Sequence, residues 1–120
     1  MSKVVNIKVK YIRPEYDNLK IWMKNKNNEY IGRKGVVFID GERFQKCDSI
    51  WCNPYKIDKN NTREDVLHKY EKYIIDKIYK EGLYEKLDIL KNKNLGCWCC
   101  PEACHGDILL KIINNKIKIE

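Results

Sequence analysis

The side chains that could do chemistry in this sequence are concentrated in one short window, residues 95–107, which reads LGCWCCPEACHGD. It holds four of the six cysteines and one of the two histidines. Thiolates and neutral imidazoles bind metals and act as nucleophiles or bases, and no other window of the chain brings so many of them together. The sequence therefore places its candidate site in this window.

The window needs three elements to position these side chains. Leu95 to Cys99 is a short apolar run that predicts a strand, Pro101 marks a turn, and the apolar residues after position 107 have the density of a buried helix face. The helix would then begin with Cys104, His105, Gly106 and Asp107. At a helix N-terminus, unpaired N–H groups and the positive end of the helix dipole favour an anion or a thiolate.

The first half of the chain predicts short strands. Alternating apolar and polar residues indicate a strand over 5–9, and another is expected over 30–33. An Asp-Gly pair is typical of a tight hairpin, here between residues 36–39 and 43–45. Residues 19–23 fit a short strand or one helical turn equally well.

The second half predicts two further helices. Apolar residues recur every four positions over Arg63–Glu81, Thr62 with Asp65 is close to a capping box, and Gly82 is a natural C-cap. A shorter helix follows, with Leu83, Leu87 and Leu90 facing inward. Alternation at Ile117 and Ile119 indicates a short last strand. The whole pattern predicts a single α/β domain over residues 1–120, with a small mixed, Rossmann-like sheet and helices packed on it.

The chain carries 24 Lys and Arg against 17 Asp and Glu, a formal net charge of +7. Such an excess is typical of proteins that contact nucleic acid. Only four of the basic residues are arginine, however, and Asn and Ile are abundant, which is the bias expected from AT-rich coding DNA. The charge therefore predicts either weak, nonspecific binding to nucleic acid or an ordinary solvated surface.

The sequence also bears on the compartment. No apolar leader follows Met1-Ser2-Lys3, and no run approaches the roughly 18 apolar residues that span a bilayer. We therefore expect a cytoplasmic protein with no membrane partner. In a reducing compartment the cysteines are expected to be free thiols, metal ligands or reactive groups instead of disulfides.

Several blocks of the chain, in this order, resemble the domain-of-unknown-function family 4326, which consists of small domains frequent in phage, viral and bacterial genomes. The blocks are Tyr30-Ile31-Gly32-Arg33, Trp51-Cys52-Asn53-Pro54-Tyr55, Thr62-Arg63-Glu64, and the cysteine window with its CWC and CHGD ends. Two departures stand out: Cys52 replaces a residue that is usually small in the family, such as glycine, and residues 34–50 form a longer hairpin insertion. The resemblance implies a fold and a site location, and no established reaction.

Zinc binding is the first interpretation of the site. The candidate ligands are Cys97, Cys99, Cys104 and His105, and zinc takes four such ligands tetrahedrally. Cysteines two positions apart are tighter than the common spacing, and neighbouring side chains on a helix point about 100° apart. Both members of the Cys104-His105 pair therefore reach a metal only if the turn is bent. Cys100 or Cys52 could replace a misdirected ligand.

A nucleotide or another phosphate-bearing ligand is the second interpretation, bound by N–H groups at the start of the last helix. Ligands of open α/β sheets bind beyond the carboxyl ends of strands, where this turn would lie. The blocks that carry the resemblance also contain Arg33 and Arg63, whose guanidinium groups can bind a phosphate, and Asn53, whose amide can hydrogen-bond to a base or a ribose. The candidate ligand-binding residues are Arg33, Asn53, Arg63, Cys104, His105, Gly106 and Asp107.

A catalytic version of this site has Cys104 as nucleophile, His105 as acid or base and Asp107 as the group that orients it. The sequence leaves open whether the protein is an enzyme. A third interpretation is purely structural: the cysteines around Trp98 fill a strand in the core. In the same way, Trp51 and Tyr55 would be core residues that anchor the turn at Asn53-Pro54.

We therefore expect a small domain that binds a nucleotide-like ligand around Cys104 and His105, with a zinc-stabilised module that contacts nucleic acid through its lysines as the alternative. In the first case Arg33, Asn53 and Arg63 should converge with these two residues on one concave surface. Loss of the Arg33 side chain should then abolish ligand binding at little cost in stability.

Overall fold

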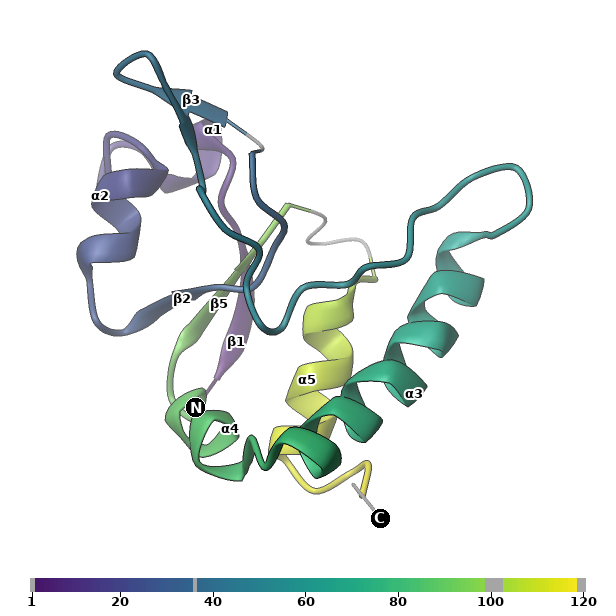
Figure 1. The fold of residues 1–120 in the computed structure, drawn as a ribbon. Helices are drawn as coiled ribbons and strands as arrows, with labels where there is room; N and C mark the ends of the chain where they lie inside the picture. Colours follow the sequence, from purple (N-terminus) through teal and green to yellow (C-terminus); the bar gives the residue numbers. More distant parts are fainter. Residues whose placement is uncertain (1, 36, 99–102, 119–120) are drawn as a thin grey trace.

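A three-stranded parallel sheet lies between two layers of other elements in the computed structural model, which describes residues 2–35, 37–98 and 103–118 (Figure 1). Its strands are β1 (Lys3–Asn6), β2 (Asn28–Tyr30) and β5 (Asn94–Cys97), in the order β1-β5-β2. The predicted α/β class is confirmed. A small mixed sheet was predicted; the three strands of this sheet are all parallel, and the antiparallel pair of the predicted hairpin forms a separate sheet.

The middle strand, β5, separates two apolar cores because its side chains alternate between the faces of the sheet. Leu95 and Cys97 point into a core shared with the last three helices. Gly96 lies on the opposite face, where the Trp22 ring and the Ile7 side chain come so close that no side chain fits at this position. This close approach is what lets a long aromatic residue cover the centre of the sheet.

The first core is covered by α3 (Arg63–Glu81), α4 (Tyr84–Ile89) and α5 (His105–Ile113). The predicted ends of α3 are confirmed: Thr62 and Asp65 form a capping box, and Gly82 closes the helix with a φ of 63°. The predicted apolar stripe is buried, and so are the three leucines expected to face inward around α4. These two helices therefore follow from local sequence signals.

The opposite face carries α1 (Val9–Ile12), α2 (Leu19–Lys24) and the hairpin of β3 (Val37–Ile39) and β4 (Glu42–Phe44). The hairpin prediction is confirmed, except that Val36 lies outside the described residues. The undecided segment at 19–23 is helical because the Asn18 side chain caps it, accepting a hydrogen bond from the Ile21 N–H.

Several strand boundaries differ from the predictions, among them the ends of β4, at Phe44 instead of residue 45, and of β5, at Cys97 instead of Cys99. β1 does not continue to Val9: the Asn6 side chain accepts a hydrogen bond from the Lys8 N–H, and this turn starts α1. β2 ends at Tyr30 instead of Arg33. The last predicted strand does not form at Ile117, whose N–H bonds back to the Lys111 carbonyl to close α5, while Ile119 lies outside the described residues.

None of the helices among the described residues combines the length and the apolar character needed to cross a membrane.

Candidate functional site

A pocket of about 440 Å³ opens beyond the carboxyl ends of β2 and β5, between the N-termini of α3 and α5. This is the position at which ligands bind in open α/β sheets. Its described lining residues are Gly32, Arg33, Asn53, Tyr55, Lys56, Ile57, Arg63, Val66, Leu67, Cys97, Trp98, Ala103, Cys104 and His105. The sequence window with the cysteines therefore forms one wall, and segments far away in the chain form the others.

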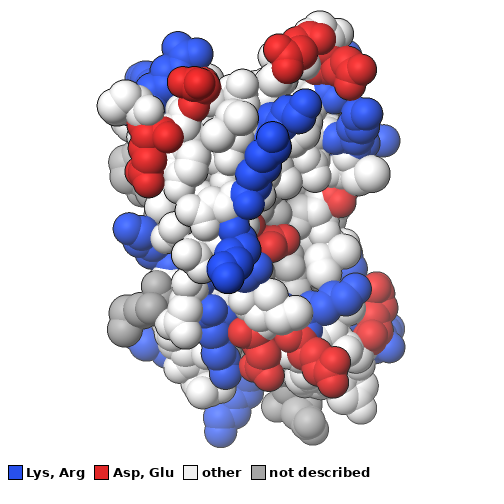
Figure 2. Space-filling view, turned by 90° about the vertical axis from the view of Figure 1, so that its left-hand side faces the viewer, with Lys and Arg blue, Asp and Glu red and all other residues white. Residues whose placement is uncertain are grey.

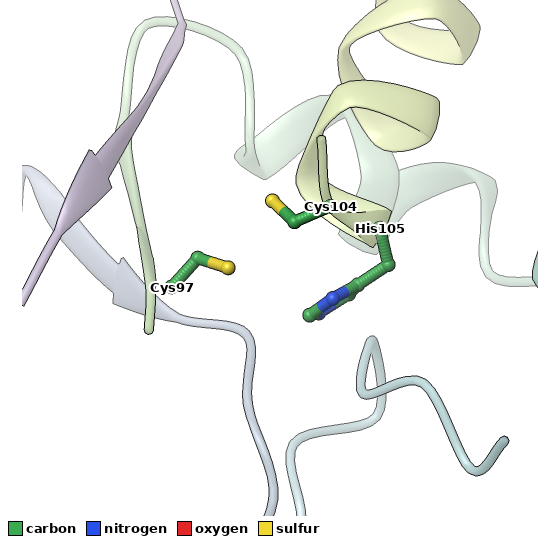
Figure 3. Close-up of side chains that lie close together, drawn as sticks. All are labelled: Cys97, Cys104 and His105. Carbon is green, nitrogen blue, oxygen red and sulfur yellow. The ribbon is translucent and has the colours of Figure 1, made fainter. Parts of the chain in front are cut away.

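Cys97, Cys104 and His105 form a tight cluster in this wall, with one sulfur or ring nitrogen of each within 4.8 Å of the others. Figure 3 shows the two sulfurs and the imidazole facing a common space between the end of β5 and the start of α5. The expected divergence of Cys104 and His105 does not occur because Cys104 is the N-cap, with extended φ and ψ of −145° and 172°, and so stands outside the helical spiral.

The other cysteines proposed as metal ligands do not join this cluster in the part of the chain that the structure describes. Cys52 is half-buried next to Trp51 and is not one of the three converging residues. Cys99 and Cys100 lie outside the described residues.

The imidazole of His105 is held in one orientation and one tautomer. Its Nε2 lies 2.6 Å from the Ile31 carbonyl oxygen, which can only accept, so Nε2 donates and Nδ1 keeps the free lone pair. The ring packs edge-on against Tyr70, with 5.2 Å between ring centroids. Burial is the main cause that lowers the pKa of His105, and the positive charge of Arg33 adds to it. The imidazole is therefore a neutral base or ligand near pH 7.

The pKa of the Cys104 thiol is lowered from its ordinary value. A hydrogen bond from the Cys97 side chain is the main cause that lowers its pKa, and backbone N–H groups of Gly106 and Asp107 also bond to its sulfur. The N–H groups predicted to bind a phosphate at the start of the helix thus point at the Cys104 sulfur of the protein itself. An external anion must find its donors elsewhere in the pocket.

Two predicted ligand-binding residues do not line the pocket. The Asp107 carboxylate accepts a hydrogen bond from the Cys104 N–H at 3.0 Å, so it caps α5 and does not orient His105 as the catalytic version required. Gly106 is buried against β1, where a Cβ atom would stand 2.7 Å from Cγ2 of Val4. Both residues position the start of α5 against the sheet.

The other predicted residues, Arg33, Asn53, Arg63, Cys104 and His105, do line one pocket. Arg33 donates from Nε to the Asn53 carbonyl and from Nη2 to the Tyr55 carbonyl, each at 2.7 Å. Arg63 donates to the Ala103 carbonyl at 2.9 Å and so ties α3 to the segment before α5. That these residues bind a ligand stays a prediction. The two hydrogen bonds of Arg33 hold the 53–55 segment in place, so we expect its loss to cost more stability than the sequence alone indicated.

Sequence reasoning missed the wall made by Tyr55, Lys56 and Ile57. Tyr55 was expected as a core anchor, but it is 37% exposed and lines the pocket, whereas Trp51 is buried as predicted. Trp98, expected in the core, also lines the pocket, and its Nε1 donates to the Tyr30 hydroxyl at 3.1 Å. The sequence did contain a sign of this wall, because Tyr55 and Ile57 are apolar residues on both sides of Lys56 in an otherwise polar loop.

We expect the metal-free protein to lose stability in acid through His105. The pKa of the His105 imidazole is lowered in the folded state. Once the pH falls below about 6.5, this imidazole therefore binds a proton in the unfolded chain but stays neutral in the folded chain. The free energy of unfolding should therefore fall as the pH drops below that value. Urea unfolding at several pH values, with a chelator present, measures it.

His105→Gln should flatten this part of the pH profile, whereas His68→Gln, at an exposed position of α3, should leave it as in the unchanged chain. An unaltered profile in the His105 variant would show that the acid sensitivity has another source.

Comparison with known proteins adds a family and two viral relatives. A family described as "Domain of unknown function (DUF4326)" matches residues 15–115. "Uncharacterized protein R718" of Acanthamoeba polyphaga mimivirus is 34% identical over 73 residues, which are 54% of this chain and 53% of the relative. An "Uncharacterized 12.4 kDa protein in nrdA-td intergenic region" of Enterobacteria phage T4 is 39% identical over 59 residues, 48% of this chain and 54% of the relative.

The chain thus spans about half the length of the curated relatives it matches. No solved structure matches it.

Proposed function

The chain belongs to the DUF4326 family, which matches residues 15–115, and from the geometry of its site we propose that the pocket binds a small phosphate-bearing ligand of the nucleotide class. One observation carries the proposal: three cationic side chains line the pocket, and none of its described lining residues is acidic. They are Arg33, Lys56 and Arg63. Guanidinium and ammonium groups gathered in one pocket favour a phosphate, because they donate charge-assisted hydrogen bonds to its oxygens.

The remaining lining suits the other half of a nucleotide. Tyr55 and Trp98 offer aromatic faces on which a base can stack, and Val66 and Leu67 provide apolar contact from α3. The pocket's volume also falls within the range of about 300–1,000 Å³ that is usual for small-molecule sites. A ligand that carries both an anionic group and an aromatic ring fits this set of lining residues.

Isothermal titration calorimetry with adenosine monophosphate, adenosine and inorganic phosphate tests the proposal, with the other nucleoside monophosphates as a second series. We expect the nucleotide to bind at least about tenfold more tightly than the nucleoside, because the phosphate meets the three cations. Lys56→Gln should weaken the nucleotide, and Lys59→Gln, in the same loop but outside the pocket, should not. Equal affinity for nucleoside and nucleotide, or no binding at millimolar concentration, would refute it.

Zinc binding is a second candidate function, favoured by the convergence of Cys97, Cys104 and His105. Thiolates and imidazole are the ligands zinc prefers. We expect about one zinc ion per chain by elemental analysis, and a lower melting temperature after chelation, since metal-binding free energy becomes folding free energy. Stoichiometry well below one, together with cysteines that react freely with a thiol reagent in the native protein, would exclude it.

The lysine-rich surface belongs to this second candidate as a contact for nucleic acid. On the α2 side of the molecule, Figure 2 shows a row of basic side chains down the middle of the face, with acidic side chains beside it as well as near the top and the bottom of the face. Such mixed charge favours weak, nonspecific binding. Fluorescence anisotropy with an oligonucleotide should then show affinity that falls steeply with salt and does not depend on sequence; no change at low salt would leave the charge without this role.

A further inference from the structure

We infer that a metal ion held by Cys97, Cys104 and His105 keeps its fourth coordination position open toward the pocket, and that an oxygen of the anionic ligand, or water in its absence, takes that position. This inference rests on the proposed function, because it requires an anion in the pocket. It joins the two candidate functions in one site: the metal, together with the arginines and the lysine, would be the anchor for the phosphate.

The three ligands sit on rigid elements and are supported from behind. Cys97 ends the central strand β5, and Cys104 and His105 begin α5. His105 donates its Nε2–H to the Ile31 carbonyl, which is the backing typical of metal-bound histidines and leaves Nδ1 as the ligand atom. The backbone N–H groups that bond to the Cys104 sulfur stabilise a thiolate in the same way.

The spacing of the cluster is close to that of a zinc site. With Zn–S bonds of about 2.3 Å and Zn–N bonds of about 2.0–2.1 Å, tetrahedral geometry places ligand atoms roughly 3.5–3.8 Å apart. One sulfur or ring nitrogen of each residue lies within 4.8 Å of the others. We expect side-chain rotations to close the remaining gap when an ion binds.

The cluster lies in the pocket wall, so a ligand in the pocket can reach an ion that the cluster holds. All three residues line the pocket, and no other described His, Cys, Asp or Glu joins them. Structural zinc sites are closed by four protein ligands, whereas three protein ligands and one exchangeable position are typical of sites that bind a ligand. Two thiolates cancel the double positive charge of the ion, so Arg33, Lys56 and Arg63 nearby do not oppose its binding.

Cobalt substitution tests this inference directly. Co²⁺ bound by two thiolates and an imidazole gives visible absorption bands that depend on its fourth ligand. We expect one equivalent of Co²⁺ to produce the absorption bands of tetrahedral coordination. Adenosine monophosphate or inorganic phosphate should shift these bands, and the concentration that gives half of the shift should equal the dissociation constant that calorimetry gives for the same probe. Stripping the metal should weaken nucleotide binding at least about tenfold. Cys104→Ser should lose the bands, and Cys47→Ser, at an exposed position, should keep them.

The outcomes separate this inference from the proposed function. Bands that no probe shifts, together with equal nucleotide affinity with and without metal, would overturn the inference and leave the proposed function standing. Failure of the unchanged protein to bind Co²⁺ or Zn²⁺ would do the same, even if the Cys104 variant does not fold. Absence of nucleotide and phosphate binding in both forms would overturn the two proposals together.

Discussion

Gly96→Val is expected to lower the free energy of unfolding by about 3 kcal/mol or more, which is a large part of the 5–15 kcal/mol typical of a domain. A Cβ atom at this position would stand 2.5 Å from Cη2 of Trp22 and 2.8 Å from Cγ2 of Ile7. β5 cannot retreat from these groups because it pairs with strands on both sides. Urea unfolding followed by circular dichroism measures the change.

Gly41→Asn in the hairpin turn is the matched control. A Cβ atom there would meet nothing within 4 Å, and asparagine tolerates the φ of 81° better than other side chains. We expect a change below about 1 kcal/mol. If the two variants unfolded at the same urea concentration, the packing of Trp22 on the sheet would be looser than the structure shows.

Arg33→Ala is expected to weaken the binding of adenosine monophosphate at least about tenfold and to cost about 1–2 kcal/mol of stability. The binding loss follows from the removal of a positive charge that forms no ion pair with a described carboxylate. The stability loss follows from the two hydrogen bonds to the Asn53 and Tyr55 carbonyls. Calorimetry and urea unfolding of the same preparation measure both effects.

Arg33→Lys separates the two roles, since lysine keeps the charge but not the planar fork that reaches two carbonyls. We expect binding between that of the alanine variant and the unchanged chain. Arg43→Ala, in the hairpin and away from the pocket, should leave binding as it is. Nucleotide affinity that survives in Arg33→Ala would restrict Arg33 to a structural role.

The helices of the second half of the chain were the most predictable part of the fold because their signals are local. Thr62, Asp65 and Gly82 act within one turn of the residues they cap, so the bounds of α3 can be read from the sequence. The end of β1 could not, since the apolar alternation continues to Val9 while one hydrogen bond from the Lys8 N–H to the Asn6 side chain turns the chain earlier.

The sequence predicted which functional groups gather at the candidate site, but it did not predict the wall at Tyr55. The residue types of the cysteine window indicated thiolate, imidazole and helix N-terminus, and the structure brings Cys97, Cys104 and His105 together. The wall at Tyr55 depends on hydrogen bonds that Arg33 makes to residues 20 and 22 positions away. Contacts at that separation leave no periodic pattern in the sequence.

The strand order β1-β5-β2 has a consequence for the route by which the chain folds. The last strand in sequence lies between the first two, so neither β1 nor β2 has a sheet partner until residues 94–97 are available. Closing so long a loop is entropically costly and slows folding, whereas α3, with its own caps, can form early. A chain still on the ribosome, from which β5 has not yet emerged, therefore already contains Arg33 and Arg63 but cannot form the pocket. The pocket is among the last features to assemble.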